Sequence, residues 1–292
     1  MDTRQEEIAD KAGEDLKNQR FHMLEDIAHE LSGELVFPTC FEVAFRLRRE
    51  LRNPDLPVTR IAKLVGVEPL IAAKLMQLSA SARYSPDGSP ARNLQAAIDR
   101  LGVELVRTTA LAIAINQMMR SKEMAIYSEL TESLWKHSVK SAAAARILAQ
   151  KRTRIDPDAA LLAGLVHDLG AFYMLYRATQ YPELRARPAT VRYLIDQWHE
   201  SIGVTLLNSL GLPEEIANAA IDHDQPRPTP DCLRTLTDIV YVANTLAGSH
   251  SEWLHQDVNG NAASMNDVCQ QFSDLLPQIE ADTQEMLSAF TA

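Results

Sequence analysis

The stretch AGLVHDLG, residues 163–170, places an imidazole and a carboxylate next to each other within an apolar segment. Apolar residues recur around it at helical spacing, and Asp156-Pro157 is typical of the N-cap and first residue of a helix. We expect this helix to run from Pro157 through Phe172. Burying a carboxylate costs several kcal/mol unless it is paired or bound to a cation. Asp168 therefore requires a partner.

The same helical spacing of apolar residues continues along almost the whole chain, without period-two alternation flanked by hairpin turns. Glycine accounts for only 11 of 292 residues, about 4% against a usual level of roughly 7%. The sequence therefore predicts an all-α fold, with a seam near residues 121–127. Helices are expected over 6–31, 57–66, 94–101, 103–120 and 128–151, and from residues 38, 69, 157, 190, 213 and 232. Pro277 is expected to kink a last amphipathic segment.

Charge and cysteine content limit the classes of function. The chain carries 29 Lys and Arg against 39 Asp and Glu, a net charge of −10, so its overall field repels phosphate backbones. The three cysteines, Cys40, Cys232 and Cys269, lie far apart, which argues against a disulfide framework or a zinc ribbon. The acidic start has no apolar region typical of a secretory signal. The longest apolar stretch, around 110–119, is too short to span a bilayer. We expect a soluble, cytoplasmic protein with no membrane partner.

Residues 59–75 have the spacing of a helix-turn-helix, with Ala62 four residues before the turn glycine, Gly66. DNA reading needs donors and basic groups on the first turn of the second helix. Here those positions hold an acid, a proline and apolar residues, with Lys74 as the one basic group. We interpret the segment as two packed helices and expect no nucleic acid partner.

Histidines and acids are the candidate metal ligands. His137 precedes the His167-Asp168 pair, and His199-Glu200 and Asp222-His223-Asp224 follow it. Nitrogen and oxygen ligands that converge from separate helices suit a first-row divalent metal, and a shared carboxylate can bridge two ions. The alternative is a buried His–Asp pair that ties helices together.

The order of these motifs resembles the HD superfamily of helical metal-dependent phosphohydrolases, and more specifically its HDOD family, a signalling branch without an assigned reaction. The segments that carry this resemblance are Phe37-Pro38-Thr39 and residues 60–65, 68–75, 94–102, 134–138, 163–170, 199–203 and 210–216. The resemblance implies an HDOD domain over 35–247, in which an N-terminal helical lobe (about 35–122) packs on an HD-like bundle (about 123–247). Helical extensions would flank it at 1–34 and 248–292.

The chain also departs from the pattern of the active enzymes. Asn244 stands where they carry a later aspartate ligand, and a neutral amide binds divalent ions less strongly. Gly170-Ala171 replaces a Gly-Lys pair, and no Gly-Tyr-Pro follows His223. The resemblance therefore implies a regulatory module that binds a signalling protein or a small ligand without catalysis, and it allows a homodimer.

The alternative hypothesis is a metal-dependent phosphohydrolase acting on a nucleotide or a cyclic dinucleotide. In that case His137, His167 and Asp168 would hold one ion, and His199 and His223 would supply further ligands. The resemblance implies Mn, Fe, Ni or Zn as the metal.

Overall fold

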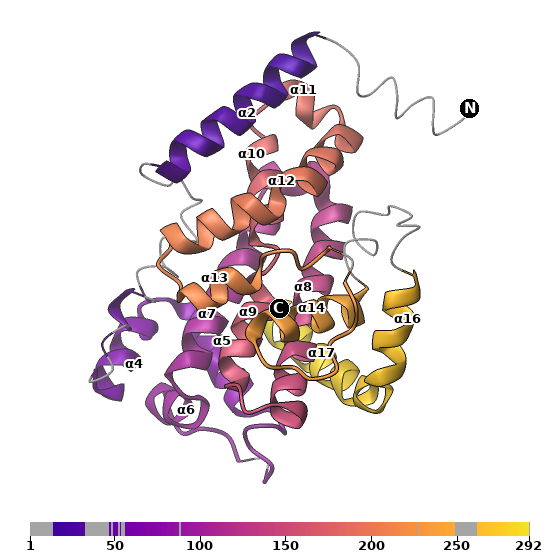
Figure 1. Ribbon diagram of the computed structural model, residues 1–292. Helices are drawn as coiled ribbons and strands as arrows, with labels where there is room; N and C mark the ends of the chain where they lie inside the picture. Colours follow the sequence, from indigo (N-terminus) through magenta and orange to yellow (C-terminus); the bar gives the residue numbers. More distant parts are fainter. Residues whose placement is uncertain are drawn as a thin grey trace. The chain divides into compact units, whose positions relative to one another are not determined.

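A computed structural model of the chain describes residues 14–32, 47, 49–51, 53, 56–87, 89–225, 227–248 and 262–291. Every regular element within these residues is a helix, which confirms the predicted all-α fold (Figure 1). The expected helix from Pro38, the Phe37-Pro38-Thr39 motif and Cys40 lie outside the described residues. The chain divides into two compact units, Met1–Val36 with Met119–Leu276, and Phe37–Met118 with Pro277–Ala292.

The second unit contains residues 59–75, the segment with the sequence spacing of a helix-turn-helix. Its helices α4 and α5 pack against each other and against α6, and Pro69 occupies the first turn of α5 as predicted. Arg83 forms an ion pair with Asp282 of the C-terminal helix α17. Pro277 lies in the first turn of α17, where proline is tolerated. The last amphipathic segment is interrupted directly before it, because a helix ends at Gln271 and a short 3₁₀ turn, Ser273–Leu275, follows. The helices of this unit are α4 (Val58–Gly66), α5 (Pro69–Ser79), α6 (Leu94–Leu101), α7 (Val103–Met119) and α17 (Leu276–Thr291).

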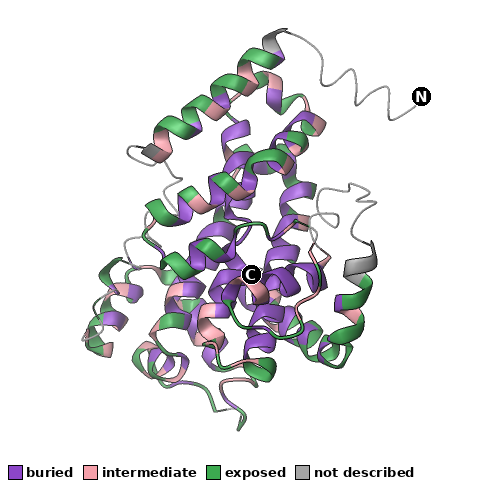
Figure 2. Cartoon of the chain, viewed as in Figure 1, coloured by how far each residue is buried: buried purple, intermediate pink, exposed green. Residues whose placement is uncertain are grey.

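The first unit is a helical bundle in which α8, α9, α10 and α14 carry most of the buried residues. Helix α8 packs against α9 and α14, and α10 packs against α12. Figure 2 draws the interior of this unit in the colour of buried residues, which include residues 160–166 of α9 and 239–247 of α14. The helices of this unit are α2 (Glu14–Ser32), η1 (Glu123–Tyr127), α8 (Ser128–Arg152), α9 (Pro157–Val166), α10 (Leu169–Ala178), α11 (Pro182–Arg185), α12 (Pro188–Ser209), α13 (Glu214–Ala219), α14 (Leu236–Ala247), α16 (Ala262–Gln271) and η2 (Ser273–Leu275).

Capping side chains set the starts of the inner helices. Asp156 accepts a hydrogen bond from the backbone N–H of Asp158 and Pro157 follows it, which confirms the predicted start of α9. Helix α14 begins at Leu236 and not at Cys232 as expected. The reason is a capping box, in which Thr235 and Asp238 satisfy each other's backbone N–H groups.

The expected single helix through the His167-Asp168 pair is two helices. Helix α9 ends at Val166, α10 begins at Leu169, and Asp168 leaves helical geometry with a ψ of 15°. Neighbouring residues of a straight helix point about 100° apart and cannot serve one site. The break at this pair therefore lets both side chains point into the same part of the core.

Among the described residues, one window is long and apolar enough to cross a membrane, and it differs from the 110–119 stretch predicted as the longest. This stretch, Pro157–Ala178, covers α9 and α10, and 89% of an 18-residue window within it is buried inside the protein. The core helices of globular proteins pass the same test of length and composition. The break at His167-Asp168 divides this stretch into α9 and α10, which are two mostly buried helices of the first unit.

Helix α2 is held against α10 and α11 by polar contacts. Tyr173 and Arg177 both donate to the carboxylate of Glu30, and the Tyr181 hydroxyl donates to Asp26. Burial and the Glu30 carboxylate raise the pKa of Tyr173, so this tyrosine stays protonated and serves as a donor. The contacts attach α2 to the bundle that carries the histidines.

Candidate metal centre

All five predicted metal ligands come together in the core of the first unit. His137 extends from α8, the His167-Asp168 pair joins α9 to α10, His199 lies on α12, and His223 follows α13. Their side chains are no more than 4% exposed. Groups of four different elements thus share one buried site.

Two glycines allow the helices to approach closely enough to form this site. A β-carbon at Gly164 of α9 would lie 2.7 Å from the carbonyl oxygen of Ser141 on α8. A β-carbon at Gly170 of α10 would lie 2.0 Å from the carbonyl oxygen of His199 on α12. Both separations are impossible for a real β-carbon. Glycine at these two positions, on either side of the His167-Asp168 pair, therefore brings α8 and α12 within reach of it.

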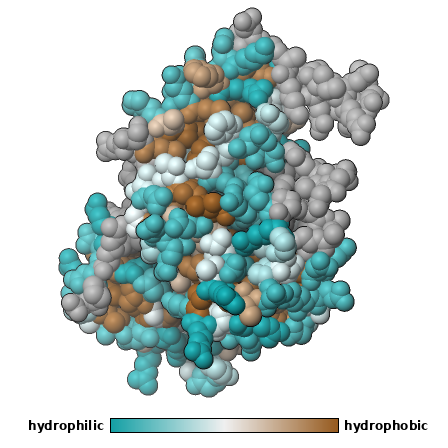
Figure 3. Space-filling view, in the orientation of Figure 1, coloured by the Kyte–Doolittle hydropathy of each residue, from teal (hydrophilic) through white to brown (hydrophobic). Residues whose placement is uncertain are grey.

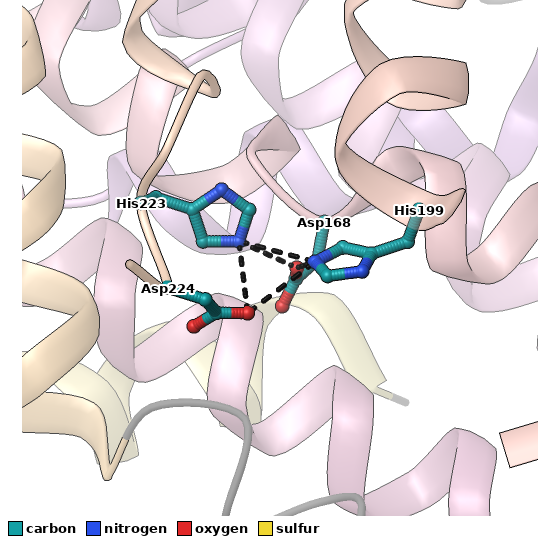
Figure 4. Close-up of side chains that lie close together, drawn as sticks. All are labelled: Asp168, His199, His223 and Asp224. Carbon is teal, nitrogen blue, oxygen red and sulfur yellow. Dashed lines mark hydrogen bonds and ion pairs between the residues drawn. The ribbon is translucent and has the colours of Figure 1, made fainter. Parts of the chain in front are cut away.

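Four donor atoms form the larger ligand group: Asp168 Oδ1, His199 Nε2, His223 Nε2 and Asp224 Oδ2 (Figure 4). His223 Nε2 lies 3.2 Å from Asp168 Oδ1, 3.4 Å from His199 Nε2 and 3.5 Å from Asp224 Oδ2. His199 Nε2 lies 3.5 Å from Asp168 Oδ1 and 3.3 Å from Asp224 Oδ2. Ligands about 2.0–2.1 Å from a tetrahedral ion are separated by about 3.3 Å. The five separations that involve a histidine nitrogen match the edges of a tetrahedral coordination shell.

The histidine rings are oriented by backbone carbonyls. Nδ1 of His199 lies 2.8 Å from the carbonyl oxygen of Ile195, and Nδ1 of His223 lies 2.9 Å from that of Ala220. A carbonyl oxygen can only accept, so Nδ1 carries the hydrogen and Nε2 of the neutral ring presents a lone pair. Two lone pairs 3.4 Å apart repel each other unless a proton or a cation lies between them. This is the tautomer and the arrangement that a metal ion requires.

A second, three-donor group shares Asp168 with the first. It consists of His137 Nε2, His167 Nε2 and Asp168 Oδ2, separated by 3.3–3.5 Å. His167 Nδ1 donates to the carbonyl oxygen of Gly164 at 2.8 Å, which fixes this ring as well. Each oxygen of the Asp168 carboxylate thus faces a different ligand group.

Burial and neighbouring charges separate the pKa values of the histidines. Burial lowers the pKa of His167 to about 4, so this ring is neutral at pH 7. Burial also acts to lower the pKa of His223, but the carboxylates of Asp224 and Asp168 outweigh it and raise the pKa to about 10. The pKa of His199 is also raised, because Asp224 and Asp168 outweigh burial. In the metal-free protein the proton on His223 compensates part of the negative charge of the two carboxylates that an ion would otherwise bind.

Beyond the five predicted ligands, Asp224, Glu200 and Asn244 also contact this cluster, and in the sequence the first two stand out only as neighbours of His223 and His199. Asp224 supplies the fourth donor of the larger group, and its adjacency to His223 was the available signal. Glu200 accepts the backbone N–H of Asp224 at 3.3 Å. Asn244 donates to Asp224 Oδ1 at 2.8 Å, a contact between residues distant in sequence. Asp222 precedes His223 with a φ of 53°, and this left-handed residue turns the chain after α13.

The described residues of the first unit form a helical bundle around a buried cluster of histidines and aspartates. This combination is typical of the class of protein that the sequence resemblance implied. The family model of the HDOD domain matches residues 37–226, well over half of the chain. The chain therefore belongs to the HDOD family. A curated relative, an uncharacterized protein of Treponema pallidum, is 24% identical over 212 residues, which is 68% of this chain. The match spans only 39% of the Treponema protein's own length.

Solved structures show the same fold. A Shewanella amazonensis protein described as a candidate metal-dependent phosphohydrolase is 22% identical with a TM-score of 0.71, over 94% of this chain and 99% of that chain. A candidate signal transduction protein from Marinobacter aquaeolei is 19% identical with a TM-score of 0.59, over 94% of this chain and 66% of that chain. An HDOD domain protein of unknown function from Geobacter sulfurreducens is 19% identical with a TM-score of 0.55, over 92% and 98% of the two chains. At these identities the likeness is one of fold.

Proposed function

We propose that this HDOD protein is a regulatory module whose buried cluster holds a divalent metal ion, and that it acts by binding a signalling protein or a small ligand without turnover. The ion would link the junction of α9 and α10, helix α12 and the segment after α13 into one bundle. Four protein ligands around one ion are typical of structural metal sites, whereas catalytic sites keep a position open for water or substrate. Zinc fits this donor set, and Mn, Fe or Ni are the other metals that imidazole and carboxylate ligands accept. We propose residues 35–247 as the functional domain and a reducing cytoplasm as its location.

The single observation that carries this proposal is the geometry of the four-donor group. Each histidine Nε2 lies 3.2–3.5 Å from the other three donor atoms, all four donors lie within 4.8 Å of one another, and both rings are fixed with Nε2 toward the centre. A hydrogen-bonded His–Asp pair, the alternative from sequence, needs only two of these four groups. It gives no reason for four donors to converge within 4.8 Å of one another.

A binding role also needs a surface, and the first unit offers an apolar one. Phe21 on α2 and Tyr193 and Trp198 on α12 are 64%, 39% and 47% exposed. Figure 3 shows hydrophobic surface in the region of these helices. Trp198 directly precedes the ligand His199, so a partner at this surface would lie on the helix that the ion fixes. Exposed aromatic residues are enriched where proteins bind partners.

The second candidate function is metal-dependent phosphohydrolysis, and the three-donor group favours it. A carboxylate shared by two ligand groups is the arrangement of two-metal hydrolases, in which the ions activate water and stabilise charge on phosphorus. His137, His167 and Asp168 would hold the second ion. The burial of all the ligands argues against it, because a phosphodiester would have to reach atoms that are hardly exposed.

Metal analysis of the purified protein combined with a hydrolysis assay separates these functions. We expect about one equivalent of a divalent metal per chain and no turnover of a generic phosphodiester or a cyclic dinucleotide by the loaded protein. A metal content below about a tenth of an equivalent would refute the metal-binding module. Turnover that is lost in a His137→Ala variant would instead establish the hydrolase.

A further inference from the structure

Asn244 of α14 contacts the metal centre through one side of its amide only. It is 1% exposed, and its Nδ2 donates to Asp224 Oδ1 at 2.8 Å and to the carbonyl oxygen of His223 at 3.0 Å. Both partners can only accept, so the nitrogen must face them and the orientation of the amide is determined. Its Oδ1 is buried without a hydrogen-bond partner. The amide of Asn244 therefore donates two hydrogen bonds and leaves its own buried oxygen unsatisfied, which is energetically unfavourable.

The contact with Asn244 determines which oxygen of Asp224 faces the histidines. Oδ1 of Asp224 is engaged by the amide, while Oδ2 lies 3.3 Å from His199 Nε2 and 3.5 Å from His223 Nε2. The Asp224 backbone is held separately by Glu200, which accepts its N–H at 3.3 Å. Two contacts thus fix Asp224, one at its backbone N–H and one at its outer carboxylate oxygen, Oδ1. The inner oxygen, Oδ2, faces the Nε2 atoms of His199 and His223.

The buried charges match one ion and not two. Asp168 and Asp224 contribute two negative charges to the core, with side chains 1% and 7% exposed. One divalent cation neutralises this pair. A second cation in the three-donor group would share Asp168 and bring no further buried carboxylate, and an uncompensated charge in a protein core is costly.

From this arrangement we infer that Asn244 is a positioning residue that presents Asp224 as the fourth ligand, so that the chain binds a single divalent ion at the four-donor group. The inference rests on the metal-binding function proposed above. An aspartate at residue 244 has no amide N–H, so both hydrogen bonds that Asn244 donates, to Asp224 Oδ1 and to the carbonyl oxygen of His223, would be lost. Asn244→Asp therefore weakens the site, although it adds a potential ligand.

Cobalt(II) titration of the full-length, metal-stripped protein tests this inference, because four-coordinate cobalt absorbs strongly in the visible range. We expect one equivalent of cobalt and a four-coordinate spectrum for the unmodified protein. We expect Asn244→Asp to lower cobalt affinity about 10–100-fold, the usual effect of removing a group that orients a ligand, and to lose that spectrum. Asn208→Asp on the exposed face of α12 makes the same change away from the site and is expected to bind like the unmodified protein.

A double-mutant cycle keeps the inference testable if Asn244→Asp does not fold. Asn244→Leu alone should weaken cobalt binding, and in an Asp224→Ala background it should have no further effect, because its target is gone. Equal losses in both backgrounds overturn the inference, as do unchanged cobalt binding or a second bound ion in Asn244→Asp. An unmodified protein that takes up no cobalt refutes the proposed function itself, whereas failure confined to the Asn244 variants refutes only the role of Asn244.

Discussion

The backbone of Gly170 packs so closely against that of His199 that a β-carbon at residue 170 would lie 2.0 Å from the His199 carbonyl oxygen. The same β-carbon would lie 2.7 Å from the backbone nitrogen of Gly203. Both obstacles are backbone atoms, which cannot turn aside as a flexible side chain can. The distance between α10 and α12, and with it the distance from Asp168 to His199, depends on the missing side chain.

Gly170→Ala is therefore expected to separate α10 from α12 and to dismantle the four-donor group. Overpacking of a core costs about 1–3 kcal/mol in the free energy of unfolding, and metal content should fall with it. Thermal unfolding and metal analysis of the purified variant measure both effects. Gly66→Ala is the matched control, because its β-carbon would make only an ordinary contact of 3.7 Å with Leu94. A metal-loaded Gly170→Ala protein of unchanged stability would contradict this role of glycine.

Removal of the metal is expected to destabilise the first unit. Saturation at about 1,000 times the dissociation constant stabilises a protein by about 4 kcal/mol, and each kcal/mol shifts the Tm of a domain of this size by roughly 2–4 °C. A chelator should thus lower Tm by roughly 8–16 °C, and zinc should restore it. In Asp168→Asn, which alters a ligand of both groups, the chelator should have no effect on Tm. An equal shift in that variant would place the metal elsewhere.

Metal uptake is expected to release protons. The pKa of His223 in the metal-free protein is raised from its ordinary value of 6.5 to about 10, because Asp224 and Asp168 outweigh burial. The stability from this protonated ring is fully present below about pH 6.5 and is lost as the pH rises through about 10. A cation at pH 7 must displace that proton, so zinc should release at least one proton per ion into a weakly buffered indicator solution. Uptake of zinc without acidification would show that His223 is not a ligand.

The fold and most of the ligands could be predicted from sequence, since helical periodicity and an ordered series of short motifs are local signals. The cap at Asp156 and the turn between α4 and α5 follow from neighbouring residues in the same way. The break between α9 and α10 could not be predicted, because nothing in an apolar run shows that two adjacent side chains must face one site.

The contact between Asn244 and Asp224 could not be predicted from sequence for a different reason. Asn244 and Asp224 meet through packing of α14 on the segment after α13, and no sequence spacing encodes that contact. The resemblance to active HD enzymes assigned Asn244 to a lost ligand position. In the structure its amide donates a hydrogen bond to Asp224. This contact forms only on folding, because the two residues are far apart in the sequence.

X-ray absorption spectroscopy at the metal edge of the purified protein tests the central claim most directly, because it reports the ligands and distances of the bound ion. We predict a single four-coordinate shell of nitrogen and oxygen donors at about 2.0–2.1 Å, with the outer-shell scattering of two imidazole rings. A six-coordinate, oxygen-dominated shell, or a spectrum without imidazole scattering, would contradict the assignment of Asp168, His199, His223 and Asp224 as the metal ligands.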